Sequence, residues 1–298
     1  MHTATLPRPA ATLFAGLAAA LTVLTALTAL TLSLPARAQV NAGPYVPSPD
    51  SAVAEMLKMA GITPKDFVID LGSGNGKIVL TAAKIYGASG FGVEIQDNLV
   101  KESNEAAKKE GVSERVKFIT QDLFKTDISR ATVLTMYLLP DTVNMLSDKL
   151  QKELRPGTRV LSHDYGLKDW QYEEYKQYDL EEKVNISGVK TTIIYLYVVP
   201  ARVAGNWNVK LPAAVSKQAV TLNLTQKVQA VTGMARVGAR EVAFMDMKLR
   251  GTEISFKLPV EPNGKPLAFT GTIKGGSIEG LVDTGKARTP WSATLAAK

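Results

Sequence analysis

The 298-residue sequence contains no cysteine and only two histidines, His2 and His163. The lack of cysteine excludes disulfide frameworks, cysteine nucleophiles and thiolate metal sites. Two histidines are too few for a histidine-based zinc centre, which needs three or four ligands, so we expect no metal site. Dense runs of lysine and arginine with interleaved aromatic residues are also missing. Nucleic acid is therefore not an expected partner.

Acidic residues are scarce at both ends of the chain. Residues 1–38 contain two arginines and no acid, and residues 200–298 contain 14 basic and 6 acidic residues. Residues 39–199 contain 19 basic and 22 acidic residues, so the net charge of +7 belongs to the two ends. Such a basic C-terminal third is typical of a solvated mixed-charge surface, and it could also favour anionic partners such as lipid headgroups. Apolar residues make up 45% of the chain, which excludes a disordered protein.

The N-terminal segment has the pattern of an export signal. Arg8 precedes an uncharged stretch over residues 9–35, and Ala36-Arg37-Ala38 then forms a small-residue cleavage site. We expect a signal peptide over residues 1–38, cleavage before Gln39, and an exported protein that is periplasmic or secreted. The alternative is an uncleaved anchor, because the apolar stretch is long enough to span a bilayer. The protein would then associate with the membrane and face the cytoplasm.

Residues 39–200 show the pattern of a first domain with alternating strands and helices. Ser48 is expected to cap a helix that starts at Pro49 and ends before Gly61. Short apolar segments then alternate with amphipathic ones, which predicts a mostly parallel sheet covered on both faces. The strands are expected over residues 67–71, 90–95, 116–120, 132–137, 158–163 and 191–199. The helices are expected over residues 77–86, 97–110 and 142–154.

Residues 201–298 show a different period. Val220, Leu222 and Leu224 alternate with polar residues, and similar runs follow, separated by turn signals. About eight short strands predict a second domain, a small antiparallel β-barrel or sandwich. Gly205-Asn206-Trp207 resembles the first strand of lipocalin-like folds. That resemblance implies a tryptophan that closes one end of a barrel, with an interior for a small apolar ligand.

The sharpest motif follows the first strand, where Asp70-Leu71-Gly72-Ser73-Gly74-Asn75-Gly76 leads into a helix. A dinucleotide fingerprint would need a third glycine at Lys77, and a P-loop would need a glycine at Leu71, so both are excluded. The pattern D-x-G-x-G-x-G resembles the first motif of class I S-adenosylmethionine-dependent methyltransferases. This resemblance implies an α/β, Rossmann-like methyltransferase sheet with S-adenosyl-L-methionine as cofactor. It also implies that the methionine part of the cofactor is held by Asp70, Gly72, Ser73, Gly74 and Gly76.

Two further strand ends agree with this resemblance. Glu94 ends the next strand, 18 residues after Gly76, where a carboxylate suits the two hydroxyls of a ribose. Gln121, Asp122 and Leu123 follow the third strand, where family members hold the adenine. We therefore expect these four residues to bind the cofactor.

Two aromatic stretches are similar to one branch of the family, the mitochondrial seven-strand protein-lysine methyltransferases and their bacterial relatives. They are Tyr45-Val46-Pro47-Ser48-Pro49 and Tyr137-Leu138-Leu139-Pro140. The resemblance implies a lysine amine as methyl acceptor, with Tyr45 and Tyr137 lining its pocket and facing the cation. Tyr137 is the candidate catalytic residue, and Tyr45 is counted with the cofactor-binding set. Tyr137-Leu138-Leu139-Pro140 replaces the Asn-Pro-Pro-aromatic motif of many N-methyltransferases, so the acceptor is either a protein or a small molecule.

Two other interpretations of the sequence concern its function. Ser162-His163-Asp164 suggests a hydrolytic triad, which we exclude because adjacent strand residues point to opposite faces. His163 alone is then either a base at the strand end or a packed side chain. A second functional class is a non-catalytic exported binding protein that retains the cofactor fold and carries an apolar molecule in its C-terminal domain.

Overall fold

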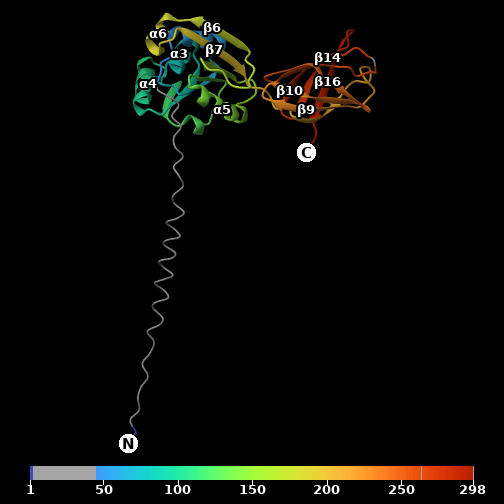
Figure 1. Ribbon diagram of the computed structural model, residues 1–298, viewed down its shortest axis with the longest axis horizontal. Coiled ribbons are helices and arrows are strands. Elements are labelled where there is room, and N and C mark those ends of the chain that lie inside the picture. Colours follow the sequence, from blue (N-terminus) through green and yellow to red (C-terminus); the bar gives the residue numbers. More distant parts are fainter. Residues whose placement is uncertain (3–44, 263, 298) are drawn as a thin grey trace. The chain divides into compact units, whose positions relative to one another are not determined.

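The computed structural model describes residues 1–2, 45–262 and 264–297. From residue 45 onward, the described chain carries two separate β-sheets (Figure 1). The predicted signal peptide or anchor lies outside the described residues. Within the described ranges, no helix combines the length and the apolar character needed to cross a membrane.

The first sheet has seven strands in the order β3-β2-β1-β4-β5-β7-β6. The first five strands in this order are parallel, while β7 runs antiparallel to both of its neighbours. This confirms the expected α/β, Rossmann-like sheet. The strands are β1 (Phe67–Leu71), β2 (Ser89–Glu94), β3 (Val116–Thr120), β4 (Val133–Met136), β5 (Arg159–His163), β6 (Glu174–Asp179) and β7 (Thr191–Val198).

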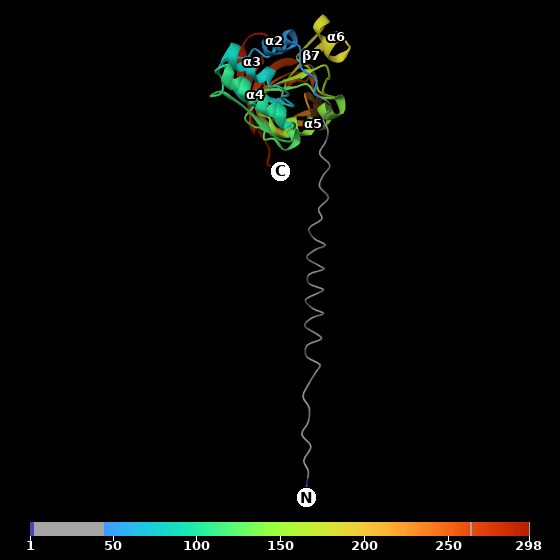
Figure 2. The ribbon, with the colours of Figure 1, turned by 90° about the vertical axis from the view of Figure 1, so that its left-hand side faces the viewer.

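Helices cover both faces of this sheet (Figure 2). One apolar core joins α2, α3 and α4 to side chains such as Val68 and Val133. The other joins α5 to Ile69 and Leu134, the next residues along the same strands, which point to the opposite face. The helices are α2 (Asp50–Met59), α3 (Lys77–Tyr86), α4 (Asp97–Lys109), α5 (Pro140–Glu153) and α6 (Glu181–Ser187), with a 3-10 turn η1 (Leu123–Lys125).

Two details differ from the sequence-based expectations. Ser48 is not the helix cap: α2 begins at Asp50 with Pro49 at the cap position and no capping side chain. The Ser48 hydroxyl is instead directed at β5, 3.4 Å from Nδ1 of His163. Strand β6 and helix α6 were not expected, because β6 is an exposed edge strand whose side chains are almost all polar or tyrosine.

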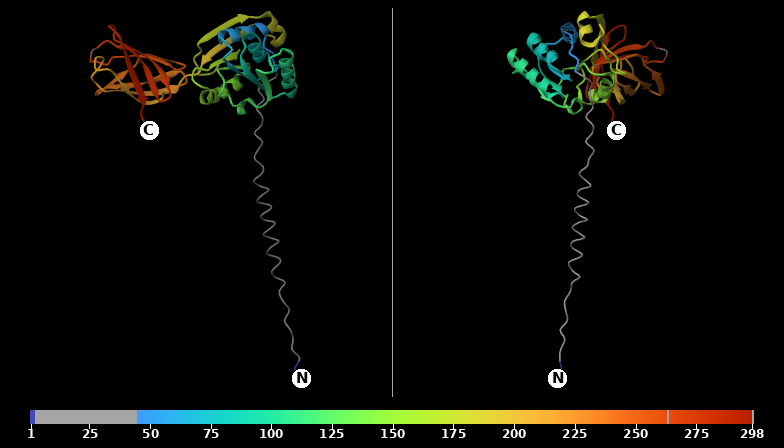
Figure 3. Two further views of the ribbon diagram at one scale, coloured as in Figure 1. Left: turned by 180° about the vertical axis from the view of Figure 1, so that it is seen from behind. Right: turned by 60° about the vertical axis from the view of Figure 1, so that its left-hand side comes forward.

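The second sheet contains nine antiparallel strands in the order β11-β10-β9-β8-β16-β15-β14-β13-β12. Its two end strands, β11 and β12, are consecutive in the chain, so the sheet curls into a nearly closed, barrel-like form (Figure 3). This confirms the expected antiparallel β architecture after Pro200. The strands are β8 (Gly205–Lys210), β9 (Val220–Lys227), β10 (Ala230–Val237), β11 (Arg240–Ala243), β12 (Met245–Arg250), β13 (Glu253–Leu258), β14 (Leu267–Lys274), β15 (Ser277–Asp283) and β16 (Arg288–Leu295).

Large side chains fill the inside of this second sheet. Trp207 is completely buried, and its ring N–H donates to the carbonyl of Val203 at 2.8 Å. Trp291 packs edge-on against Phe256 and Phe269, whose rings stack on each other. These packed aromatic side chains form the core of the sheet. The lipocalin-like resemblance is not confirmed.

Candidate active site

The glycine turn between β1 and α3 depends on close packing. Gly74 and Gly76 have positive φ angles of 52° and 79°, which favour glycine. A Cβ atom on Gly74 would lie 2.3 Å from the ring of Tyr45, and one on Gly76 would lie 2.6 Å from the ring of Phe118. The amides of Gly72 and Ser73 donate to the carbonyl of Val93 at the end of β2. The turn is therefore held against β2 by its own backbone.

Glu94 lies directly beside this turn. Its carboxylate accepts hydrogen bonds from the amides of Gly74 at 3.0 Å, Ile95 at 2.7 Å and Gln96 at 3.0 Å, and its side chain is buried. The structure thus brings Glu94 to the turn, as the sequence predicted. The bond from Gly74 also gives Glu94 a role in shaping the turn, in addition to its predicted role toward a ribose.

Asp70 lies inside the sheet, where it accepts a hydrogen bond from the Thr135 hydroxyl at 2.7 Å. Burial raises the pKa of the Asp70 carboxyl to about 7, helped by the nearby charge of Glu94 and opposed by the bond from Thr135. The neighbouring Ser73 hydroxyl is buried and makes no hydrogen bond within the described part of the chain. This unsatisfied hydroxyl and the two carboxylates fit a polar ligand with amine and hydroxyl groups.

The predicted adenine-binding residues lie at the end of β3. The amide of Gln121 donates to the carbonyl of Glu94 at 3.0 Å, which brings this strand end to the same edge. The Asp122 carboxylate accepts from the amide of Phe124 at 2.8 Å and so caps the short turn η1, while Leu123 is buried. Their predicted contacts with adenine stay predictions.

Tyr45 covers the glycine turn from outside. Its ring lies against Gly74, and its exposed fraction is 37%. Burial of the hydroxyl raises the pKa of Tyr45, while a hydrogen bond with the backbone of Asn75 opposes this change. The next residue, Val46, lines a cavity, the pocket beside Tyr137. The segment before α2 thus forms a wall shared by the turn and the pocket.

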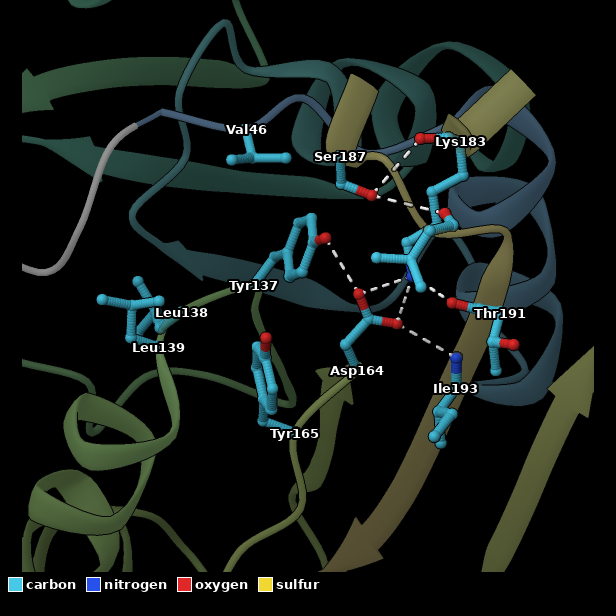
Figure 4. A pocket seen from close by; sticks show the side chains of 11 residues that line it. Val46, Tyr137, Leu138, Leu139, Asp164, Tyr165, Lys183, Ser187, Thr191 and Ile193 are labelled. Carbon is cyan, nitrogen blue, oxygen red and sulfur yellow. Dashed lines mark hydrogen bonds and ion pairs between the residues drawn. The ribbon is translucent and has the colours of Figure 1, made fainter. Parts of the chain in front are cut away.

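This pocket has a volume of about 360 Å³ and opens beside Tyr137 (Figure 4). Leu138 lines it, and the same side chain approaches Gly72 so closely that a Cβ atom there would lie 2.7 Å from Leu138. The pocket and the glycine turn are therefore neighbours. The lining residues are Val46, Tyr137, Leu138, Leu139, Asp164, Tyr165, Lys183, Ser187, Val189, Thr191 and Ile193.

Asp164 is the polar centre of the pocket. The Tyr137 hydroxyl donates to it at 2.9 Å, the Lys183 ammonium lies 2.7 Å from both of its oxygens, and the amide of Ile193 donates at 3.1 Å. Asp164 has a positive φ of 63°, an uncommon conformation for a residue with a side chain. Burial, and then the Asp164 charge, raise the pKa of Tyr137.

His163 is a packed side chain. It is completely buried, its ring lies 4.0 Å from that of Tyr137, and burial lowers its pKa to about 4. It is therefore neutral at physiological pH. Ser162 donates to the carbonyl of Tyr165, so it does not face His163, and the exclusion of a triad stands. The expectation that Asp164 points away from His163 was wrong. The left-handed backbone of Asp164 turns its carboxylate back to 3.6 Å from Nε2 of His163.

Sequence reasoning missed Lys183 and assigned no role to Asp164. Lys183 belongs to α6, which the sequence did not predict, and its position in a polar, charge-rich stretch gave no signal of burial. Asp164 carried one available signal, because it directly follows a strand in an open α/β sheet, where ligands bind.

Comparison with known proteins identifies the first sheet. A family described as the ANTKMT methyltransferase domain matches residues 70–174. A "Protein-lysine N-methyltransferase" of Saccharolobus islandicus is 40% identical over 157 residues, which are 52% of this chain and 93% of that protein. The chain belongs to this methyltransferase family.

A second relative extends well beyond the region that it shares with this chain. The "Adenine nucleotide translocase lysine N-methyltransferase" of Mus musculus is 35% identical over 138 residues, which are 46% of this chain and 58% of that protein. The chain thus spans little more than half the length of this mouse relative.

One similar solved structure is described as an RNA methyltransferase from Salinibacter ruber in complex with S-adenosyl-L-homocysteine. It is 40% identical, covers 53% of this chain and 96% of its own, and has a TM-score of 0.48. The protein is an S-adenosyl-L-methionine-dependent methyltransferase. The alternative of a non-catalytic binding protein is not favoured.

Proposed function

We propose that the protein transfers the methyl group of S-adenosyl-L-methionine to the side-chain amine of a lysine in another protein. The observation that carries the proposal is the 40% identity, over 93% of its length, to a relative named as a protein-lysine N-methyltransferase. The pocket at Tyr137 supports it, because Leu138 and the segment Tyr45–Val46 link that pocket to the glycine turn. Its lining combines apolar side chains with the polar groups of Tyr137 and Asp164, which suits the aliphatic stem and terminal amine of a lysine.

We propose that the glycine turn and its neighbours hold the cofactor. Asp70, Ser73 and Glu94 would bind its polar groups, together with the residues at the end of β3. When bound, the cofactor supplies an electrophilic methyl group on a positively charged sulfur. The protein then has to hold the acceptor amine in line with that methyl group and exclude water, which is mainly a matter of positioning.

The Tyr137 hydroxyl is suited to orient the amine. Its hydrogen is directed at Asp164, so a lone pair of its oxygen is free to accept a hydrogen bond from an N–H in the pocket. The acceptor must first lose a proton to solvent, because a lysine amine has an ordinary pKa of about 10.4. The lone pair of the neutral amine would then form the N–C bond, and the electrons of the broken C–S bond would stay on the sulfur of the cofactor.

Labelling of a protein extract tests the acceptor. The purified protein is incubated with the extract and isotopically labelled S-adenosyl-L-methionine, and the products are identified by mass spectrometry. We expect methyl groups on lysine nitrogen, and none with a Gly74→Val control, whose side chain would overlap the Tyr45 ring. Label found only on carboxylates, hydroxyls, RNA or small molecules would exclude a lysine acceptor while leaving the methyltransferase activity in place.

We also propose that the protein is exported, with the anchored, cytoplasm-facing form as the alternative. The support is the pattern of residues 1–38. Export raises the question of cofactor supply, since S-adenosyl-L-methionine is made in the cytoplasm. The anchored form meets no such difficulty and would place the methyltransferase next to membrane proteins.

A further inference from the structure

Lys183 lies in the pocket as a buried cation. Only 2% of the residue is exposed, and its ammonium contacts both oxygens of Asp164 and the carbonyl of Thr191. Figure 4 shows Asp164 between Tyr137 and Lys183, and all three residues line the pocket. A lysine is rarely buried so completely unless a partner balances its charge. Here Asp164 provides that balance.

The ion pair between Lys183 and Asp164 changes the charge that an incoming amine meets in the pocket. An unpaired Asp164 carboxylate would attract a lysine as its ammonium ion and would hold the proton on it, because a nearby opposite charge favours the charged form. An ammonium has no lone pair and does not attack a methyl group. A second positive charge beside the carboxylate cancels this attraction. The site then favours the neutral, reactive amine.

We propose that Lys183 is a positioning residue that neutralises Asp164, so that the acceptor amine binds Tyr137 in its uncharged form. The inference rests on the proposed amine acceptor. Lys183 acts through Asp164 and does not itself react. Because Asp164 keeps its charge toward Tyr137, the direction of the Tyr137 hydroxyl hydrogen is preserved at the same time.

Four titratable groups around Asp164 keep one charge state over the useful pH range. His163 is neutral above its pKa of about 4, and burial raises the pKa values of Tyr137, Tyr178 and Tyr195. None of these four changes charge between pH 6 and 9. The groups facing Asp164 or Lys183 are His163 of β5, Tyr137 after β4, Tyr165 after β5, Tyr178 of β6 and Tyr195 of β7.

Binding of n-butylammonium, measured by ligand-observed NMR at pH 7, tests the charge balance without cofactor or methyl transfer. Lys183→Gln keeps a hydrogen-bond donor but removes the charge, so we expect at least tenfold tighter binding than in the wild type. Lys190→Met removes a largely exposed lysine outside the pocket and should change nothing. The double variant Asp164→Asn/Lys183→Met removes both charges and should bind no more tightly than the wild type.

The pH dependence of methyl transfer to the protein extract gives the second readout. In Lys183→Gln, the rate should rise at a pH about one unit higher than in the wild type. The rate at pH 7 therefore falls roughly tenfold, and it returns to the wild-type rate at alkaline pH. Lys183→Arg keeps the charge and should keep the wild-type profile. A role limited to anchoring α6 would instead lower the rate equally at every pH.

Two results would overturn the inference. One is unchanged or weaker n-butylammonium binding in Lys183→Gln that is still folded by thermal unfolding. The other is a parallel loss of rate across the pH range. If Lys183→Gln does not fold, Lys183→Met carries the same expectations, and the double variant removes the unpaired carboxylate. If the wild type methylates no amine at all, the proposed function fails, while the n-butylammonium measurement still decides the charge balance.

Discussion

At the scale of single residues, Asp164 determines the chemistry of the pocket. It accepts hydrogen bonds from a phenol, an ammonium and a backbone amide at once, in a backbone conformation that side chains rarely adopt. Such strained positions cluster at functional sites, because the surrounding structure has to stabilise them. The direction of the Tyr137 hydroxyl follows from this one carboxylate.

The first prediction concerns that hydroxyl. From the sequence, the Tyr137 ring was expected to line the pocket, a role that Tyr137→Phe would preserve. The hydrogen bond to Asp164 changes this expectation: we now expect Tyr137→Phe to lower kcat roughly tenfold to hundredfold, the cost of a lost hydrogen bond to a charged group. Tyr165→Phe in the same pocket is the matched control and should retain activity. Equal kcat values for the two variants would show that only the rings matter.

Glu94 gives a second prediction. Glu94→Ala removes the acceptor of three backbone amides and a predicted ribose contact, so S-adenosyl-L-homocysteine should bind about 1.5–3 kcal/mol more weakly by calorimetry. Asp97→Ala removes a nearby acid whose side chain accepts a hydrogen bond from the Thr120 hydroxyl, and this variant should bind normally. Unchanged affinity in Glu94→Ala would move the cofactor site away from this turn.

Asp70 makes a third prediction, on pH. Its folded pKa of about 7 lies above the unfolded value of 3.8, so the folded state holds the proton more tightly. The stability contributed by this proton is present below about pH 4 and is lost as the pH rises to about 7. Asp70→Asn removes the titration and should therefore be more stable than the wild type at pH 8 by roughly 1–4 kcal/mol. Urea unfolding of both proteins at pH 5 and pH 8 measures the difference, which should shrink at the lower pH.

At the scale of elements, glycines in β2 allow the parallel strands to approach. A Cβ atom on Gly90 would lie 1.9 Å from the carbonyl oxygen of Val68 in β1, which is backbone and cannot rotate away. We expect Gly90→Ala to cost about 3 kcal/mol or more of unfolding free energy, measured by denaturant unfolding. Gly276→Ala, whose nearest new contact would be at 3.9 Å, is the matched control and should cost far less. A small loss in both would mean that β1 and β2 can separate at little cost.

Much of the element order followed from the sequence. The range 67–71 for β1 and the range 77–86 for α3 are reproduced to the residue, because an apolar run ends at a glycine turn and a helical period follows. Strand β6 and helix α6 could not be predicted in this way. Strand β6 is exposed, and Lys183 is the residue of α6 that is buried, through its ion pair with Asp164, so neither element leaves an apolar period in the chain.

The candidate site was also predictable from the sequence only in part. Glu94 meets the glycine turn and Gln121 meets Glu94, as their strand-end positions predicted, since parallel strands end at one edge. The role of Asp164 depends on its left-handed backbone conformation. The contribution of Lys183 depends on a residue of α6, 19 positions later in the chain, packing back against Asp164. Neither is encoded in local spacing.

At the scale of the whole molecule, two sheets follow each other along the chain with a change at Pro200. The division into a domain over residues 39–200 and a domain over residues 201–298 stays a prediction, as does the signal over residues 1–38. N-terminal sequencing of the protein recovered from its source cells tests the latter and should begin at Gln39. An intact N-terminus in the membrane fraction would establish the anchor instead.

The strand order of the second sheet has a consequence for synthesis. Strand β8, the first strand of this sheet in the chain, pairs with β16, the last one, so Trp207 lies beside Leu295 although almost the whole sequence of the sheet separates them. While the ribosome is still producing the intervening strands, β8 has one hydrogen-bonded edge without its partner. The nascent segment therefore stays incomplete, and open to chaperones, until residues 288–295 emerge. Deleting that single strand would leave the emerged chain with two unpaired edges at the centre of its strand order.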